Sequence, residues 1–317
     1  MKKQSKKFML AGVVLLAIAG LLALTSCKND SVPEPPSEAD WLQEQKKELE
    51  GKTEGIITAP SYLTKGGLVD LAKLLRDLPH KVRVDLDLSQ ATGLTYIAAG
   101  TFIKCGTLQS VKLPSSVTEI GPYAFKDCTS LTEVTIPEGV TFIESYAFNN
   151  CQSLTEVTIP ASVTFIGENA FEDCTSLTDV TIPASVTEIG PYAFAYTNLS
   201  EVTIPEGVTT IEYGTFYCCT GLTKVTIPEG VTTIDNNAFY DCSSLSEVTI
   251  PASVKTIGVS AFEGTDLTSV TFENEDGWHL QNPETNVIGD LIDVGTFSAN
   301  AEKLRRGDWV NMNLIRE

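Results

Sequence analysis

The sequence predicts a repeat solenoid: coils of 22 or 23 residues stacked along one axis, with a parallel β-sheet on one face and short strands or single-turn helices on the other. Two observations predict this fold. The segment LTEVTIPEGVTFIESYAFNNCQS, residues 131–153, recurs about eight times along the chain. Each copy opens with the apolar–polar alternation of a half-buried strand and then meets a proline, which cannot continue a β-ladder. A repeated unit too small to bury its own apolar face is typical of stacked coils.

Residues 1–26 have the features of a signal peptide. Four lysines precede an uncharged apolar run, Leu10–Leu24, and small residues stand directly before Cys27. A cysteine in this place is typical of bacterial lipoprotein signals, in which it is acylated after cleavage. We therefore expect Cys27 to carry a lipid anchor to a membrane, and a chance cysteine is the alternative. No other stretch approaches the roughly 20 apolar residues of a membrane span.

The chain is strongly acidic. Without residues 1–26 it has 18 basic and 41 acidic side chains, a net charge of −23. Such a surface repels nucleic acid and anionic phospholipid headgroups, so neither is an expected ligand of the folded part. Most of this charge is interpreted as a solubilising surface.

Two segments precede the repeats. Residues 27–55 are predicted to be the lipidated cysteine and a flexible acidic tether, because the stretch SVPEPPSEAD is polar and rich in proline. Within this range Ser37 and Asp40 resemble a capping box, which predicts a short helix after them. Residues 56–81 are predicted to be an N-terminal helical cap, because five leucines recur in them at helical spacing.

Residues 82–272 are predicted to be the solenoid. They open with VRVDLDL, in which apolar and charged residues alternate. In each copy of the repeat we expect the apolar strand residues, the alanine–phenylalanine pair and the cysteine to point inward, the last three around a single turn of helix or 3₁₀-helix. Stacking then joins equivalent residues into continuous ladders. The phenylalanine recurs at Phe102, Phe125, Phe148, Phe171, Phe194, Phe216, Phe239 and Phe262.

Residues 273–317 leave the template and are predicted to be a C-terminal cap, with a helix over residues 300–306. No catalytic set is recognisable along the chain. Its two histidines, His80 and His279, lie near opposite ends of the predicted solenoid, and there is no phosphate-binding glycine loop. We therefore predict no enzyme, no metal site and no cofactor.

Six of the eight cysteines share one template position and would stack about 5 Å apart, the spacing of neighbouring strands. That spacing allows disulfides between adjacent coils, and a metal site is a third interpretation. Thr197 and Thr265 fill the same position in the two shorter coils, which favours a ladder of small buried thiols. Cys218 lies outside the ladder and is expected to be exposed. The ladder consists of Cys105, Cys128, Cys151, Cys174, Cys219 and Cys242.

Two rows of outward-facing residues on the predicted sheet are the candidate ligand-binding site. One row is mainly acidic and the adjoining row is mainly threonine. Like charges stacked across paired strands are destabilising, so the acids have a local cost. They are interpreted either as solubilising residues that discourage edge pairing, or as a docking face for a basic protein segment or a loosely held cation. The candidate residues are Glu133, Glu156, Asp179, Glu201, Thr135, Thr158, Thr181 and Thr203.

The repeats resemble the BspA-type leucine-rich repeats of bacterial surface proteins, whose units read LxxVxIPxxVTxIxxxAFxxC. The resemblance covers roughly residues 82–272, where the proline, the alanine–phenylalanine pair and the cysteine recur in register. It implies a right-handed solenoid with a parallel sheet along one face. It also implies export to the surface of host-associated bacteria and a role in binding host or bacterial proteins.

The leading hypothesis is a non-enzymatic lipoprotein, exposed on the outer membrane, that binds proteins and mediates adhesion through one solenoid face. An alternative is a glycan-binding accessory lipoprotein of a nutrient uptake system, and a third is a structural surface spacer without a specific ligand. The glycan alternative rests on aromatic residues beside the sheet, which could stack on sugars or pack between coils. They are Phe142, Phe165, Tyr123, Tyr146, Tyr192 and Tyr213.

Overall fold

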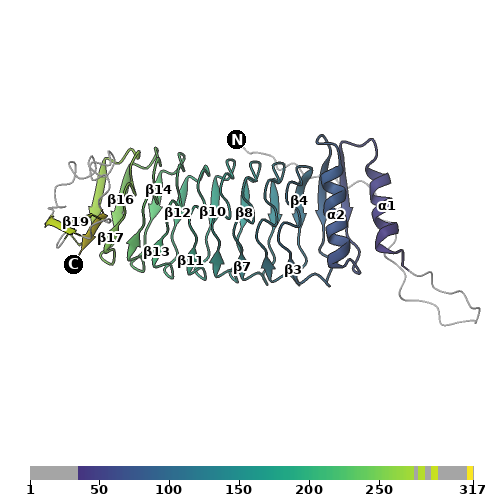
Figure 1. Ribbon diagram of the computed structural model, residues 1–317, viewed down its shortest axis with the longest axis horizontal. Coiled ribbons are helices and arrows are strands. Elements are labelled where there is room, and N and C mark those ends of the chain that lie inside the picture. The colour runs from purple at the N-terminus through teal and green to yellow at the C-terminus, as the bar shows by residue number, and fades with distance from the viewer. Residues whose placement is uncertain (1–34, 275–277, 283–286, 292–312, 317) are drawn as a thin grey trace, which may run out of the picture. The chain divides into compact units, whose positions relative to one another are not determined.

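The structure, a computed structural model, describes residues 35–274, 278–282, 287–291 and 313–316. The chain divides into two units, Met1–Pro35 and Pro36–Glu317, and apart from Pro35 all described residues belong to the second. This second unit is a stack of coils with two helices at its N-terminal end (Figure 1). The predicted signal peptide and the Cys27 anchor lie outside the described residues.

Helix α1, Glu38–Leu49, opens the second unit. Ser37 caps it, because the Ser37 hydroxyl accepts a hydrogen bond from the Asp40 backbone N–H at 3.2 Å. The helix that the sequence predicts here is therefore confirmed. Helix α1 is amphipathic only in part, and two buried side chains, Trp41 and Leu49, hold it against the core.

The folded unit begins earlier than the sequence suggests. Strand β1, Glu54–Thr58, follows α1 and pairs in parallel with the first repeat strand, β2, Arg83–Asp87. Helix α1 and the first two residues of β1 fall within residues 27–55, which we predicted to be a flexible tether. That range is too long at its C-terminal end, because burial of α1 and pairing of β1 join these residues to the cap.

Helix α2, Lys65–Asp77, closes the N-terminal end of the stack, where the sequence predicts a helical cap. Its apolar side buries Leu68, Leu71 and Leu75 against the first coil. The Thr107 hydroxyl of that coil donates to the Leu75 carbonyl at 2.7 Å, which ties the helix to the coil beneath it. The apolar end of the first coil is thereby kept from water.

The first strand of each coil builds one parallel face of the stack, which we call the strand face. After β2 its strands are β4 Leu108–Lys112, β6 Glu133–Thr135, β8 Glu156–Thr158, β10 Asp179–Thr181, β12 Glu201–Thr203, β14 Lys224–Thr226, β16 Glu247–Ile250 and β18 Ser269–Phe272. Pairing is continuous from β1 to β10 and resumes in the pairs β12–β14 and β16–β18. Neighbours are in register, so Glu133 lies beside Glu156 and Val134 beside Val157.

A second, two-residue strand in each coil builds a second parallel sheet. Its strands are β3 Tyr96–Ile97, β5 Glu119–Ile120, β7 Phe142–Ile143, β9 Phe165–Ile166, β11 Glu188–Ile189, β13 Thr210–Ile211, β15 Thr233–Ile234 and β17 Thr256–Ile257. This sheet is interrupted between β11 and β13, at the same coil boundary as the strand face. The coil before that boundary, which starts at Leu177, has 22 residues. The coil at Leu245 is equally short and keeps its strand pairing, so length alone does not account for the interruption.

The third side of each coil, which we call the turn face, consists of turns instead of the single helical turn that the sequence suggests. In one coil the backbone N–H groups of Tyr146, Phe148 and Asn150 donate to carbonyls of the next coil at 2.8 Å. The N–H groups between them donate within their own coil. A helix would direct all of these bonds along its own axis, so the alternation replaces a helix with a third ladder between coils.

Two residues of every coil on the turn face have a left-handed backbone. One precedes the alanine or threonine before the ladder phenylalanine, and the other stands two positions after that phenylalanine. Tyr146, with φ of 61°, and Asn150, with φ of 60°, are one such pair. Left-handed geometry costs about 1 kcal/mol or more for a residue other than glycine, asparagine or aspartate. Outside these types it is adopted by Lys104, Tyr123, Tyr146, Tyr192, Tyr196, Cys218 and Ser260.

The predicted phenylalanine ladder forms the centre of the core. All eight rings are at most 1% exposed. Neighbouring rings stack with their centroids 5.1–5.8 Å apart and their planes within 12° of parallel. Ring spacing thus follows the spacing of the coils, so each coil completes the core of both of its neighbours.

The cysteine ladder is buried and its thiols are free, as predicted. The thiols donate to carbonyls of the preceding element, as Cys151 Sγ does to the Phe125 oxygen at 3.2 Å. Burial raises the pKa of Cys105 to about 11, which keeps that thiol protonated. Where threonine replaces cysteine, the hydroxyl bonds within its own coil, and Thr197 Oγ1 donates to the Phe194 oxygen at 2.8 Å. The same hydroxyl oxygen lies 3.2 Å from Cys219 Sγ of the next coil. Cys218, the cysteine outside the ladder, is half-buried and not fully exposed as expected.

The chain beyond the repeats returns to the last coils. Strand β21, Asn313–Arg316, pairs antiparallel with β17. Strand β19, Trp278–Asn282, pairs with β21, and β20, Val287–Leu291, pairs with β19. These strands extend the second sheet within residues 273–317, where we predicted a C-terminal cap. The helix predicted over residues 300–306 lies outside the described residues.

Replacement of Phe171 by alanine should lower the free energy of unfolding by about 3–5 kcal/mol, because the stack cannot close over the lost ring. The matched control is Phe142→Ala, which removes the same side chain from a position that is 43% exposed. It should cost about 1 kcal/mol or less. Denaturant unfolding followed by circular dichroism compares the two, and equal losses would contradict the shared core.

Thiol labelling of the folded chain should distinguish Cys218 from the ladder. In a Cys27→Ser variant, a thiol reagent should modify Cys218 and leave the six ladder cysteines unreacted, because the reagent cannot reach thiols that are buried in the core. Denaturant should make all seven remaining cysteines reactive. Fewer than seven after denaturation would reveal a disulfide in the ladder.

Candidate binding face

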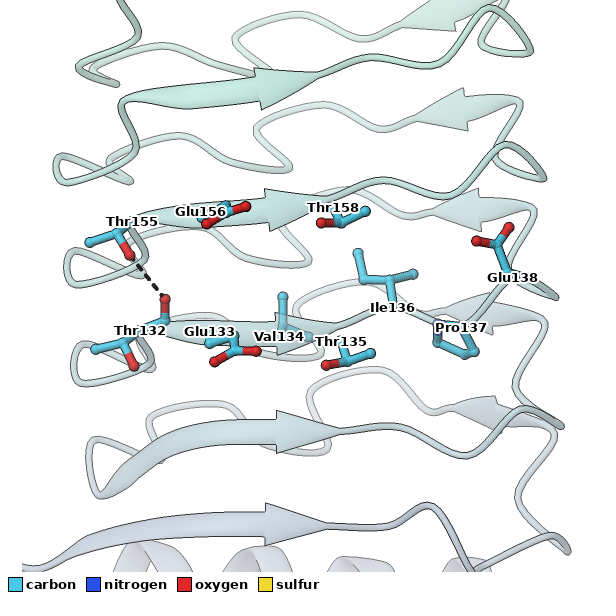
Figure 2. Close-up of a pocket in the computed structure, with 10 residues that line it drawn as sticks. All are labelled: Thr132, Glu133, Val134, Thr135, Ile136, Pro137, Glu138, Thr155, Glu156 and Thr158. Atoms are coloured by element: carbon cyan, nitrogen blue, oxygen red, sulfur yellow. Dashed lines mark hydrogen bonds between the residues drawn. The ribbon is translucent and has the colours of Figure 1, made fainter. Parts of the chain in front are cut away.

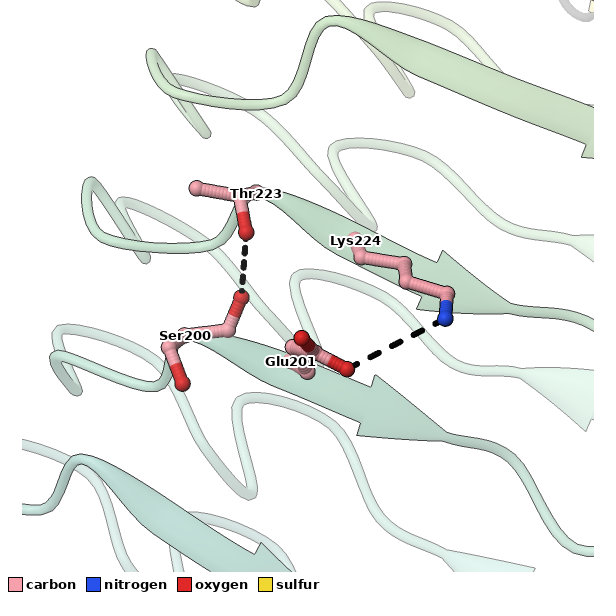
Figure 3. Close-up of polar contacts among 4 residues, drawn as sticks. All are labelled: Ser200, Glu201, Thr223 and Lys224. Carbon is pink, nitrogen blue, oxygen red and sulfur yellow. Dashed lines mark hydrogen bonds and ion pairs between the residues drawn. The ribbon is translucent and has the colours of Figure 1, made fainter.

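The four candidate acids lie on the strand face at equivalent positions of successive coils. Glu133, Glu156 and Asp179 are paired directly across β6, β8 and β10, and all three are exposed. Glu201 begins β12, beyond the interruption of the sheet. It faces Lys224, with 4.0 Å between Glu201 Oε2 and Lys224 Nζ (Figure 3).

The first three acids form an uncompensated row. Within the described part of the chain, Glu133, Glu156 and Asp179 take part in no ion pair and no side-chain hydrogen bond. Carboxylates directly opposite each other on paired strands repel. The single exposed pair of Glu201 with Lys224 is worth at most about 1 kcal/mol. The row therefore holds negative charge that a cationic ligand would relieve.

The candidate threonines differ from the other threonines of the repeat. In two other columns the hydroxyls donate to backbone carbonyls of the preceding coil. In one column Thr155 Oγ1 donates to the Thr132 oxygen at 3.4 Å (Figure 2), and Thr223 Oγ1 to the Ser200 oxygen at 3.0 Å (Figure 3). In the other column Thr141 Oγ1 donates to the Thr118 oxygen at 3.3 Å. In the candidate row the hydroxyls have no partner among the described residues, and they remain available to a ligand. This row contains Thr135, Thr158, Thr181 and Thr203.

The two rows border an open depression of about 560 Å³ over β6 and β8. Figure 2 shows Glu133 beside Glu156 and Thr135 beside Thr158 on the neighbouring strands. Two further depressions, of about 190 and 390 Å³, lie on the strand face near β4 and near β16. The strand face is therefore hollowed at several points along the acidic and threonine rows.

The sequence around the rows contains no basic residue over a long stretch. From Asp127 to Thr223, 97 residues include 13 aspartates and glutamates and no lysine, arginine or histidine. The total charge of the chain does not reveal this segment, although the absence of basic residues is visible in the sequence. A one-sign surface of this length produces a field that attracts cations before contact.

Other titratable groups are not gathered into a site in the part of the chain that is described. There, no group of three or more histidine, cysteine, aspartate and glutamate side chains is placed to hold a metal ion. His80 is exposed beside the N-terminal cap, and His279 belongs to β19. Among the described helices, none is long and apolar enough to cross a membrane.

The aromatic residues considered for sugar stacking lie away from the strand face. Phe142 and Phe165 are neighbours on the second sheet, with ring centroids 6.3 Å apart. Tyr123 and Tyr146 stack on the turn face with centroids 4.9 Å apart. Phe142 is 43% and Tyr123 41% exposed, so these rings are only partly packed between coils.

The turn face also carries aromatic residues that the sequence analysis missed. Tyr192 and Tyr213 belong to a larger group with Tyr196, Tyr217 and Tyr240. Their signal in the sequence is weak, because the five tyrosines are spread over four columns of the template in three successive coils. The stacking of the coils is what brings them together.

The stacked parallel strands, the fixed coil length and the leucine that opens each coil define a leucine-rich repeat solenoid. The chain belongs to the BspA type leucine rich repeat region family, whose model matches residues 95–221 and 166–277 with six copies. The resemblance stated from the sequence is thus confirmed. Leucine-rich repeat proteins are typically non-enzymatic binding scaffolds that use the extended surface of the stack.

The solved structures that are similar to this chain include two leucine-rich repeat proteins. A leucine-rich repeat protein of T. pallidum is 34% identical, with a TM-score of 0.50, over 61% of this chain and 83% of that one. A leucine-rich cell surface protein of Faecalibacterium prausnitzii is 30% identical, with a TM-score of 0.51, over 70% of this chain and 69% of that one. The comparison with curated proteins found no match.

Proposed function

We propose that this chain is an exported, surface-displayed protein that binds other proteins through its strand face and catalyses no reaction. One observation carries the proposal. The candidate acids and threonines offer carboxylates and hydroxyls that, apart from Glu201, have no partner among the described residues. On β6, β8 and β10 they lie in register, beside a hollow in the strand face. The partner that fits such a face is an extended basic protein segment.

Recognition on the strand face would be passive. The negative field raises the rate at which a basic segment meets the face. Lysine and arginine side chains then pair with the acidic row, while donors of the partner bond to the threonine hydroxyls. The shared core already holds the coils in place, so binding needs little ordering of the face and loses little entropy.

Export is supported by two observations. Residues 1–26 have the features of a lipoprotein signal ending before Cys27, and the similar protein of Faecalibacterium prausnitzii is a cell surface protein. The net charge of the folded unit opposes direct contact with anionic lipid headgroups, so an acylated Cys27 would supply the attachment. We accordingly propose an outer-membrane lipoprotein whose folded unit faces outward.

Glycan binding is the second candidate function, favoured by the exposed rings of Tyr123 and Phe142. It would use the turn face and the second sheet instead of the strand face. Pull-down with matrix proteins and a glycan array separate the two candidates. Binding of neither class would favour a structural spacer.

Replacement of Glu133, Glu156, Asp179 and Glu201 by lysine should weaken the binding of a peptide of alternating lysine and serine by about 30-fold, if each lost pair is worth about 0.5 kcal/mol. The dependence of the dissociation constant on salt should also flatten, because fewer ion pairs form. Isothermal titration calorimetry at several salt concentrations measures both effects.

The matched control reverses four exposed acids away from the two rows, Glu119, Glu168, Glu188 and Glu206. This variant has the same net charge, so it weakens the long-range field equally while leaving the rows intact. It should bind more tightly than the strand-face variant. Equal affinities would refute a docking role for the rows and leave only a general charge effect.

Replacement of Cys27 by serine should release the protein from the membrane fraction, because the acyl chains that anchor it can no longer be attached. Fractionation and metabolic labelling with a fatty acid measure this. Protease added to intact wild-type cells should remove the folded unit. Survival of the unit in intact cells, with loss only after lysis, would contradict outward display.

A further inference from the structure

Five tyrosines form a cluster on the turn face, over the coils that flank the interruption of both sheets. Ring centroids are 5.2 Å apart for Tyr192 and Tyr213, 5.5 Å for Tyr196 and Tyr217, and 4.9 Å for Tyr217 and Tyr240. Tyr196 is 41% and Tyr213 36% exposed, and the other three are half-buried. This tyrosine cluster lies outside the strand face and takes no part in the function proposed above.

Two of the tyrosines occupy backbone positions that disfavour them. Tyr192 has φ of 54° and Tyr196 has φ of 58°, both in the left-handed region. Asparagine tolerates this region better than tyrosine does. The chain itself places Asn169 and Asn150 at the equivalent positions of other coils. The backbone therefore does not require tyrosine at either position.

The surroundings of the cluster are negative. Burial, with the Cys218 thiol and the Asp173 carboxylate as further causes, raises the pKa of Tyr196. Burial and Cys218 likewise raise the pKa of Tyr217 to about 12, so its hydroxyl stays neutral. The Asp241 carboxylate is the main cause that raises the pKa of Tyr240. The segment without lysine, arginine or histidine extends over the other four tyrosines.

Elsewhere on the molecule, lysines of the chain itself lie over tyrosine rings. Lys126 Nζ is 5.2 Å from the ring centroid of Tyr146 on the turn face, and Lys65 Nζ is 3.8 Å from that of Tyr96. Lys126 directly follows a ladder phenylalanine, and Tyr217 stands at the equivalent position of its coil. The cluster thus presents a ring where another coil supplies its own cation, and no described lysine or arginine lies over it.

We propose that the tyrosine cluster binds an arginine side chain of a partner protein. A guanidinium can lie flat on an aromatic ring and bond a carboxylate at the same time, which a lysine ammonium does less well. Asp173 and Asp241 supply carboxylates near the rings, and the tyrosine hydroxyls supply acceptors. The occupant is therefore an arginine-bearing protein segment, bound on a face separate from the strand face.

The test measures, by fluorescence anisotropy at physiological salt, how tightly the full chain binds a labelled peptide of alternating arginine and glycine. The double variant Tyr192→Asn/Tyr196→Asn should bind about tenfold more weakly, because two rings are lost while the net charge is unchanged. Its asparagines are residues that the chain already accommodates at these positions. The variant Tyr217→Lys should bind at least as weakly, because it places a cation in the cluster as Lys126 does in its own coil.

The matched control is Tyr123→Asn, the same change at the equivalent position of a coil that has Lys126. It should bind the peptide as the unchanged chain does. Citrulline in place of arginine keeps the shape of the side chain and removes its charge, and it should abolish the tyrosine-dependent binding. The double asparagine variant keeps the net charge and should keep the salt dependence of binding, whereas reversal of the strand-face acids changes it. Failure of the tyrosine site is therefore distinguishable from failure of the strand face.

Three results would overturn the proposal. The first is unchanged affinity in the double variant, with its fold verified by circular dichroism. The second is equal binding of the arginine and citrulline peptides. The third is tyrosine-dependent binding of neutral oligosaccharides that displaces the peptide, which would make the cluster a platform for sugars.

Discussion

No coil of this protein can bury its own apolar side chains, so each coil depends on the one before it and the one after it. An inner phenylalanine ring such as Phe148 is covered on both faces by rings of its neighbours. Backbone hydrogen bonds on three sides of the coil hold that spacing. A nearly constant repeat length follows, because a residue gained in one coil would shift its columns against the next coil. The residue types at inward positions of the repeat are thereby restricted, whereas those at outward positions can differ from coil to coil.

Much of this architecture could be predicted from the sequence. The period of 23 residues determines which side chains share a column, and the alternation of side chains along a strand determines which of them point inward. The ladders and the strand-face rows follow directly. The turn face does not follow, because Lys104, Tyr146 and Cys218 give no hint of a left-handed backbone. The start of the folded unit was also misplaced. Helix α1 has few apolar residues, and only the tertiary contacts of Trp41 and Leu49 show that it belongs there.

The candidate sites divide in the same way. The acids Glu133 and Glu156 could be predicted as neighbours from one repeat length, but the availability of the Thr135 hydroxyl could not, since it rests on which threonine columns bond to the preceding coil. The tyrosine cluster depends on three coils and on different template positions. Neither Tyr196 nor Tyr240 stands out in the sequence, and their partner Tyr217 links them only once the coils are stacked.

The cysteine ladder bears on how the chain can mature in an oxidising compartment. Six equivalent thiols in an unfolded chain have many alternative disulfide pairings, and none of them is native. A disulfide that forms before the coils stack would prevent correct stacking and would have to be reduced again. Once the coils stack, each sulfur lies against a carbonyl in the core, as Cys151 does against Phe125, out of reach of an oxidant. Stacking of the coils thus protects the thiols from oxidation. In an oxidising compartment the chain reaches its native state only if it folds before its cysteines are oxidised.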